Sequence, residues 1–174
     1  MFADVRTRPD DTRTINAAIM ISASRLTPVE ESTDQLDRPL RLLIVEDSRD
    51  DADLLLSAVL RGGFGVTHEV VDNSPAMRAA LERQDWDVIT SDVSMPRFSA
   101  PAAMALAREL RPHVPVFIVS GETDVDDAAT LIRDGARDFI QKHELPRLVP
   151  AIERTMRETQ ARLEYGAALA RWLQ

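Results

Sequence analysis

The segment Val88-Ile-Thr-Ser-Asp-Val-Ser-Met-Pro96 takes a short apolar run to a carboxylate, Asp92, and then to a proline. Proline has no backbone N–H, so a predicted strand cannot continue through Pro96. In open α/β sheets, ligands bind in the crevice beyond the carboxyl ends of the strands. The segment therefore predicts a buried strand that ends in a functional carboxylate.

A second pair of acids, Glu46 and Asp47, follows the apolar run Leu42-Leu-Ile-Val45. If this run and the strand before Asp92 are parallel neighbours, three carboxylates meet at one edge of a sheet. Carboxylates this close repel one another unless a divalent cation lies among them or some of them stay protonated. The pattern therefore indicates a site for a cation or for bound protons.

The composition excludes several classes of protein. The chain has 174 residues, of which 44% are hydrophobic and 29% charged, and a formal net charge of -8. This length suits one domain with tails. The acidic balance argues against binding to nucleic acid or to an anionic membrane, and the absence of cysteine excludes disulfides and thiolate zinc sites. We find neither an apolar stretch of transmembrane length nor a signal peptide, and we expect a cytoplasmic protein.

Three segments are expected along the chain. Residues 1–39 have no sustained period and contain three prolines among scattered charges, which predicts a flexible N-terminal extension. Residues 40–157 alternate five apolar runs with helical patterns, as in a doubly wound α/β fold with a parallel sheet. Residues 158–174 are expected to form a C-terminal helical extension. The predicted strands are Leu40–Val45, Val66–Val71, Trp86–Ser91, Val114–Ser120 and Arg137–Lys142, and the helices begin after Ser48, at Asn73 and Ser74, at Pro101, after Asp124 and near Pro146.

The turns of this predicted fold limit its chemistry. The turn Glu46-Asp-Ser-Arg49 contains no glycine, which excludes the glycine-rich loops that hold nucleotide phosphates, and the chain has no Gly-x-Ser-x-Gly motif. Besides the three acids, the strand ends supply the hydroxyl of Ser120 and the ammonium of Lys142. These groups suit phosphoryl capture, in which the acids hold Mg²⁺ and Asp92 also acts as the nucleophile. The hydroxyl and the ammonium would meet the charge on the phosphoryl oxygens.

Residues 40 to about 157 resemble the receiver domain of bacterial two-component response regulators. The resemblance implies a flavodoxin-like fold of five βα units with the strand order 2-1-3-4-5. Four motifs in order carry it: Leu42-Leu-Ile-Val-Glu-Asp-Ser48, Ile89-Thr-Ser-Asp-Val-Ser-Met-Pro96, Val116-Phe-Ile-Val-Ser-Gly121 and Gly135-Ala-Arg-Asp-Phe-Ile-Gln-Lys142.

The resemblance also implies roles for single residues. Asp92 is the expected phosphoacceptor, which takes phosphate from a sensor histidine kinase or from a histidine phosphotransfer protein. Lys142 is expected to pair with the phosphate, Ser120 to be the switch hydroxyl and Phe139 the switch aromatic. The expected ligands of Mg²⁺ are Glu46, Asp47, Asp92 and the backbone carbonyl of Ser94.

Two positions depart from the family pattern. His143 follows Lys142 where the family usually has a proline in a cis peptide, and a cis bond before histidine costs about 3 kcal/mol, so we expect another path for this loop. Ala100 stands where the family commonly has glycine, four residues after the motif proline, so we expect a reshaped turn after Asp92.

We expect a signalling domain and not an enzyme. No segment resembles a helix-turn-helix or a catalytic output module, so we expect a stand-alone receiver that contacts a downstream protein through its helix 4, strand 5 and helix 5 face. A homodimer stays open, although Leu163 and Leu169 form no clean heptad series. Two single positions have an alternative to a switch role: Ser120 could be an ordinary turn residue, and Phe139 could be a residue of the core. Two rival functions are a docking scaffold that is never phosphorylated and an aspartate-nucleophile phosphatase.

Overall fold

The computed structural model describes residues 38–121 and 125–172. Its centre is a five-stranded sheet in the order β2-β1-β3-β6-β7, in which all neighbouring strands are parallel. Counted along the chain this is the order 2-1-3-4-5, so the predicted flavodoxin-like fold is confirmed. Residues 1–37 of the predicted N-terminal extension lie outside the described residues, as does Asp124. The strands are β1 (Leu40–Val45), β2 (Val66–Val71), β3 (Val88–Ser91), β6 (Val116–Ser120) and β7 (Asp138–Gln141).

Three of the helices begin at polar capping residues. Ser48, Asn73 and Ser99 each accept a hydrogen bond from the backbone N–H three residues later, which satisfies a donor that has no partner inside the helix. The caps at Ser48 and Asn73 were predicted, whereas the third helix starts one residue before the predicted Pro101. The helices are α2 (Arg49–Arg61), α3 (Ser74–Arg83), α4 (Ala100–Leu110), α5 (Val125–Arg133) and α6 (Leu148–Trp172).

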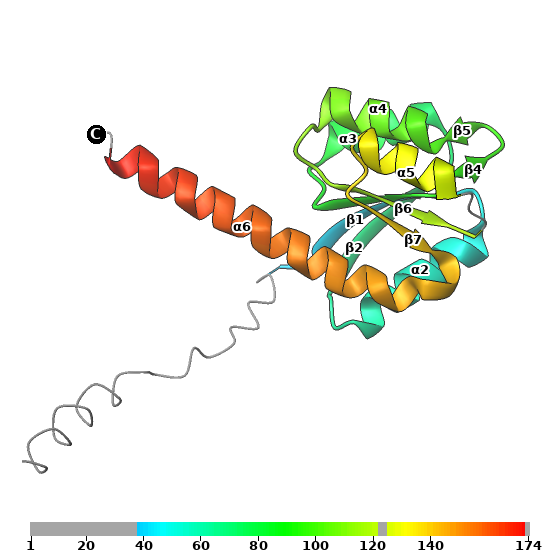
Figure 1. The fold of residues 1–174 in the computed structure, drawn as a ribbon, viewed down its shortest axis with the longest axis horizontal. Coiled ribbons are helices and arrows are strands. Elements are labelled where there is room, and N and C mark those ends of the chain that lie inside the picture. The colour runs from blue at the N-terminus through cyan, green and yellow to red at the C-terminus, as the bar shows by residue number, and fades with distance from the viewer. Residues whose placement is uncertain (1–37, 122–124, 173–174) are drawn as a thin grey trace, which may run out of the picture. The chain divides into compact units, whose positions relative to one another are not determined.

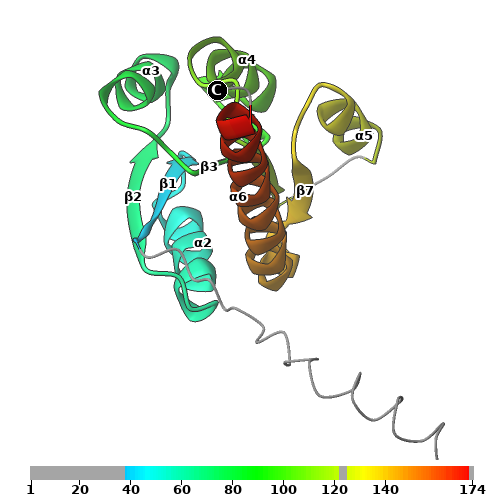
Figure 2. The same cartoon turned by 90° about the vertical axis from the view of Figure 1, so that its left-hand side faces the viewer.

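Two helical layers cover the sheet, with α3, α4 and α5 on one face and α2 and α6 on the other (Figures 1 and 2). Successive residues of a strand point to opposite faces. Leu43 and Val45 therefore join the apolar cluster beneath α3, α4 and α5, whereas Leu42 and Ile44 join the cluster against α2 and α6. Because both faces are covered, the central strands are apolar at consecutive positions, which explains the pattern seen in the sequence.

Two central strands begin later than predicted, β3 at Val88 and β6 at Val116. Trp86 is buried, but its indole N–H donates to the Ala80 carbonyl at 3.0 Å, near the end of α3. Pro115 has no N–H to give to the sheet. Burial thus extends beyond the paired residues at the amino edge of the sheet.

A short hairpin follows Asp92 and was not predicted. β4 (Ser94–Met95) and β5 (Phe98–Ser99) pair antiparallel, with Met95 opposite Phe98 and both side chains buried. Ala100 is fully buried and is the first residue of α4. A helical residue needs no positive φ, so alanine is accommodated at this position without strain.

A 3₁₀-helix, η2 (Lys142–Arg147), follows β7 directly and precedes α6. No cis peptide bond occurs among the described residues, so the peptide that joins Lys142 to His143 is trans. This agrees with the expectation that a histidine here would not sustain a cis bond.

Only the first part of α6 packs on the domain. Leu148 and Ile152 are fully buried against β1, β6 and α2. From Arg157 to Trp172 every side chain is exposed, and Trp172 is 90% exposed. Among the described helices, none combines the length and the apolar character that crossing a bilayer requires.

Candidate functional site at the carboxyl edge of the sheet

The ends of β1 and β3 are neighbours, which brings two of the predicted acids together. Val45 is in register with Ser91, so Glu46 and Asp92 follow directly beyond adjacent strands. The Asp92 N–H donates to the Val45 carbonyl at 2.9 Å and continues the pairing by one residue. Both acids are buried, with side-chain exposures of 6% for Glu46 and 9% for Asp92.

Lys142 reaches these acids from the end of the edge strand β7. Its Nζ lies 3.0 Å from Glu46 Oε2 and 3.2 Å from Asp92 Oδ1. Its aliphatic part passes over Gly121, where an added Cβ would lie 3.6 Å from Lys142 Cδ. The structure therefore brings together one lysine and two of the predicted acids, from three different strand ends.

A third carboxylate, which the sequence reasoning missed, is the nearest partner of this ammonium. Asp51 Oδ2 lies 2.5 Å from Lys142 Nζ, and the Asp51 side chain is 33% exposed. Asp51 belongs to the first turn of α2, where its backbone N–H donates to the Ser48 hydroxyl at 3.3 Å. An acid in the first turn of a helix that follows a site strand was the available signal. Acids favour helix N-termini in general, so the signal is weak.

The ammonium and the carboxylates change each other's affinity for protons. Burial lowers the pKa of Lys142, but hydrogen bonds to Asp51 and Glu46 and the charge of Asp92 outweigh this and raise the pKa of Lys142. Burial raises the pKa of Glu46, although hydrogen bonds from Lys142 and from the Ser48 N–H oppose it. At neutral pH the lysine is therefore a permanent cation in the site.

Two further predicted residues flank this cluster. Asp47 is exposed and lines an open cleft that also contains His68. Ser120 is the last residue of β6, is 3% exposed and is in register with Gln141, the residue before Lys142. The structure therefore places Ser120 at the same edge of the sheet and leaves Asp47 facing solvent.

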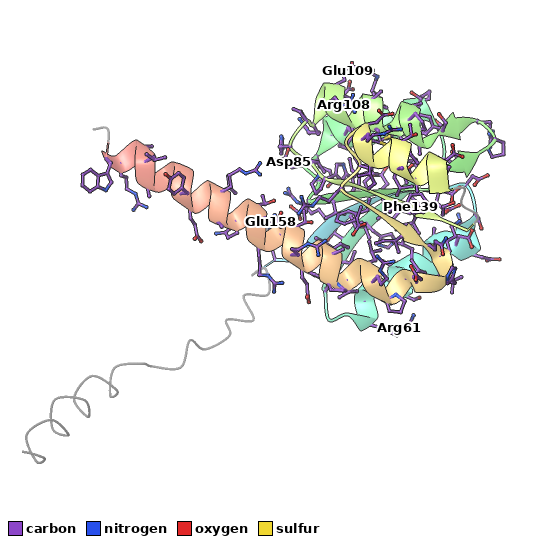
Figure 3. All side chains as sticks on the ribbon, in the orientation of Figure 1. Arg61, Asp85, Arg108, Glu109, Phe139 and Glu158 are labelled. Atoms are coloured by element: carbon purple, nitrogen blue, oxygen red, sulfur yellow. The ribbon has the colours of Figure 1, made fainter. Side chains whose placement is uncertain are left out.

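The predicted switch aromatic and the predicted carbonyl ligand also have defined positions. Phe139 lies on β7 in register with Ile118, is partly buried and packs against the cluster beneath α3, α4 and α5 (Figure 3). Ser94 opens the β4–β5 hairpin two residues after Asp92. Its backbone therefore belongs to the same end of β3 as the acids.

The donors at this edge suit a hard cation in kind, because carboxylate and carbonyl oxygens are the ligands that Mg²⁺ takes. Within residues 38–121 and 125–172, no group of three or more acidic, histidine or cysteine side chains has the geometry to hold a metal ion. Instead the Lys142 ammonium bridges Glu46 and Asp92. A cation bound here would share these two carboxylates with the lysine.

Comparison with known families gives a match over most of the chain. The model of the response regulator receiver domain matches residues 42–153. Response regulator protein FleR of Pseudomonas aeruginosa is 34% identical over 104 residues, which are 59% of this chain and 21% of FleR. Transcriptional regulatory protein PrrA of Mycobacterium tuberculosis is 31% identical over 102 residues, 59% of this chain and 43% of PrrA. DNA-binding transcriptional regulator NtrC of Salmonella typhimurium is 30% identical over 95 residues, 54% of this chain and 20% of NtrC. The chain thus spans less than half the length of these relatives.

Solved structures share the fold. NtrX from Brucella abortus superimposes with a TM-score of 0.66 at 23% identity, covering 75% of this chain and 30% of NtrX. The receiver domain of the Francisella response regulator 1452 gives 0.60 at 18% identity, covering 70% of this chain and 99% of that domain. The response regulator domain of Thermotoga maritima CheB gives 0.58 at 27% identity, covering 69% of this chain and 98% of that domain. At their identities the first two likenesses concern the fold alone.

Proposed function

Since the chain belongs to the response regulator receiver domain family, we propose that Asp92 accepts a phosphoryl group from the phosphohistidine of a sensor histidine kinase or of a histidine phosphotransfer protein. One observation carries this proposal: Asp92 is buried at the end of a central strand, with its Oδ1 3.2 Å from Lys142 Nζ. Receiver domains are signalling domains, so we assign the chain a phosphoacceptor role and no catalytic turnover of an external substrate.

The proposed transfer moves a phosphoryl group from a ring nitrogen to a carboxylate oxygen. An oxygen of Asp92 attacks phosphorus, the N–P bond breaks as the O–P bond forms, and the imidazole leaves with the electron pair of the broken bond. The negative charge on the phosphoryl oxygens would be met by the Lys142 ammonium and by the Ser120 hydroxyl. Because Asp92 is 9% exposed, its burial would limit the access of water to the resulting acyl phosphate.

We propose that this site holds Mg²⁺, because its donors are oxygens and several of them are anionic. When bound, the ion would supply positive charge to the phosphoryl oxygens. The residues that would hold it are Glu46, Asp47, Asp92 and the backbone carbonyl of Ser94.

We propose that the signal is passed on by protein contact through the face formed by α5, β7 and α6. Ser120 ends β6, and Phe139 lies on the adjacent strand. Movement of the Ser120 hydroxyl toward a phosphoryl group would alter the packing next to Phe139 and would bias an existing two-state equilibrium of this face. The net charge of -8 favours a protein partner over DNA.

The exposed part of α6 carries apolar side chains through which a homodimer could form. Leu163, Leu169 and Trp172 are exposed along it. Sedimentation of the chain before and after phosphorylation tests this possibility, and a monomer in both states would end it.

The deciding experiment is incubation with acetyl phosphate, with and without Mg²⁺, followed by measurement of the intact mass. The proposal expects one added phosphoryl group in the wild type with Mg²⁺ and none in Asp92→Asn. A wild type that gains no phosphoryl group would be a docking scaffold, and turnover of an external phosphomonoester would indicate a phosphatase. Phosphotransfer from a panel of histidine kinases would then identify the donor.

A further inference from the structure

We propose that Asp51 competes with the phosphoryl group for Lys142 and so sets how readily Asp92 is phosphorylated. The inference rests on the phosphoacceptor role proposed above. Asp51 would be a positioning residue, because it acts through the lysine and does not touch the phosphoryl group.

The order of distances around the ammonium is the first observation. Lys142 Nζ lies 2.5 Å from Asp51 Oδ2, 3.0 Å from Glu46 Oε2 and 3.2 Å from Asp92 Oδ1. A lysine ammonium has three N–H donors, and here three carboxylates surround it. Phosphorylation replaces the Asp92 carboxylate by a phosphoryl group with more charge and more acceptor oxygens. Lys142 can give this group more than one N–H only if its contact with Glu46 or with Asp51 weakens.

Burial decides which contact weakens. The side chain of Glu46 is 6% exposed, whereas that of Asp51 is 33% exposed. A buried carboxylate that loses its cation is left uncompensated, but a partly exposed one is resolvated by water. Phosphorylation should therefore draw Lys142 away from Asp51.

The loss of the contact between Lys142 and Asp51 costs free energy in the phosphorylated state, whereas the unphosphorylated state keeps this contact. Removing the charge of Asp51 destabilises the state in which Lys142 is held back, so the phosphorylated fraction at a fixed donor concentration should rise. Partly exposed ion pairs contribute little, so we expect the ratio of phosphorylated to unphosphorylated chain at a fixed acetyl phosphate concentration to increase about two- to fivefold.

The ordinary explanation for Asp51 is that of an acid near a helix N-terminus. Asp50 provides a matched control, because it lies in the same first turn of α2, carries the same charge and is exposed. Asp50→Asn and Asp51→Asn remove the same charge from the same helix end. Only Asp51→Asn also removes the nearest partner of Lys142.

The test compares wild type, Asp50→Asn and Asp51→Asn in the full chain at a series of acetyl phosphate concentrations with Mg²⁺, with the phosphorylated fraction read from the intact mass. We expect the phosphorylated fraction of Asp51→Asn to be higher than that of the wild type, and the fraction of Asp50→Asn to equal that of the wild type. A double-mutant cycle of urea unfolding with Lys142→Met measures the coupling of Asp51 to Lys142 in the unphosphorylated protein, which we expect to be favourable.

The outcomes separate the two proposals. If the wild type is phosphorylated on Asp92 but Asp51→Asn behaves like Asp50→Asn or is phosphorylated less, the competition is refuted and the proposed function stands. A coupling of zero in the unfolding cycle also refutes the competition. If the wild type takes up no phosphoryl group, the proposed function fails and the competition fails with it.

Discussion

Replacement of Asp87 by asparagine should reveal how strongly one buried carboxylate stabilises the domain. Asp87 precedes β3 at the amino edge of the sheet, and its side chain is 6% exposed. It accepts hydrogen bonds from two Arg38 nitrogens at 2.6 and 2.7 Å. It also accepts from the Arg41 backbone N–H at 2.9 Å and from Arg41 Nη2 at 3.0 Å. One carboxylate therefore fixes the start of β1 beside the start of β3.

The pKa of Asp87 gives the magnitude. Burial raises this pKa, but the hydrogen bonds from Arg38 and Arg41 outweigh burial and lower it from 3.8 to about 2. At about 1.4 kcal/mol per pKa unit, the shift corresponds to about 2 kcal/mol of stability. The Arg38 side chain is 48% exposed, so solvent screens part of this, and we expect a loss of about 1 to 2 kcal/mol in Asp87→Asn at pH 7.

The pH dependence follows from the sign of the shift. The pKa of Asp87 is lower in the folded than in the unfolded chain, so the contribution is complete above the unfolded value of 3.8. It is lost as the pH falls through about 2. The wild type and Asp87→Asn should therefore differ fully at pH 7 and converge in acid.

Urea unfolding of both chains over this pH range measures the difference. Asp85→Asn is the control, because the Asp85 side chain is 68% exposed and lies 4.0 Å from Arg41 and 3.7 Å from Arg111. Such a pair should contribute less than about 0.5 kcal/mol. Equal losses in the two variants, or a loss in Asp87→Asn that persists in acid, would refute the reasoning.

Three further changes have expected outcomes in the same unfolding assay. The buried Thr90 hydroxyl has no hydrogen-bond partner within the described residues, so Thr90→Val should raise the free energy of unfolding by about 0.5 to 1 kcal/mol; a loss would show that the hydroxyl is satisfied after all. Thr155→Val is its control, because Thr155 donates to the Ala151 carbonyl at 2.9 Å and accepts from Arg137 at 3.0 Å, and its replacement should cost about 1 to 2 kcal/mol. Gly62→Ala would place a Cβ 2.5 Å from Val149 Cγ2 and should cost about 1 to 3 kcal/mol; Val149→Ala in the same chain should recover part of the loss, and no recovery would argue against a clash. Lys142→Met leaves Glu46 and Asp92 buried without their cation and should lower the free energy of unfolding by about 1 to 3 kcal/mol at pH 7. An unchanged urea midpoint would contradict a contribution of these ion pairs to stability.

The sequence predicts strands best where apolar runs have sharp limits. The bounds of β1 and β2 agree with the prediction at both ends, because Pro39 and Gly65 precede these runs and polar residues follow them. Trp86 and Val114 are buried as well, but they lie outside the paired residues. An apolar run predicts burial and does not by itself show which residues join the ladder of hydrogen bonds.

The candidate site, too, could be predicted from the sequence only in part. Glu46, Asp92 and Lys142 could be placed from the sequence because the carboxyl ends of parallel strands meet at one edge of the sheet. The contact with Asp51 could not, since it depends on the exact start of α2 and on the direction of a long lysine side chain. The β4–β5 hairpin was missed because strands of two residues show no period.

The balance of charge at this edge links the proposals. Three carboxylates face one ammonium, so the cluster carries an excess of negative charge before any phosphoryl group arrives. The raised pKa of Glu46 reflects the cost of holding such charge in a buried place. A phosphoryl group would add to that excess, and Lys142 can offset it only by leaving Asp51. We therefore expect phosphorylation to require a further cation at the same edge, and removal of the Asp51 charge to lessen that requirement. The Mg²⁺ concentration that gives half-maximal phosphorylation should accordingly be lower in Asp51→Asn than in Asp50→Asn. Equal values in the two variants would show that the contact between Asp51 and Lys142 does not affect the requirement for Mg²⁺.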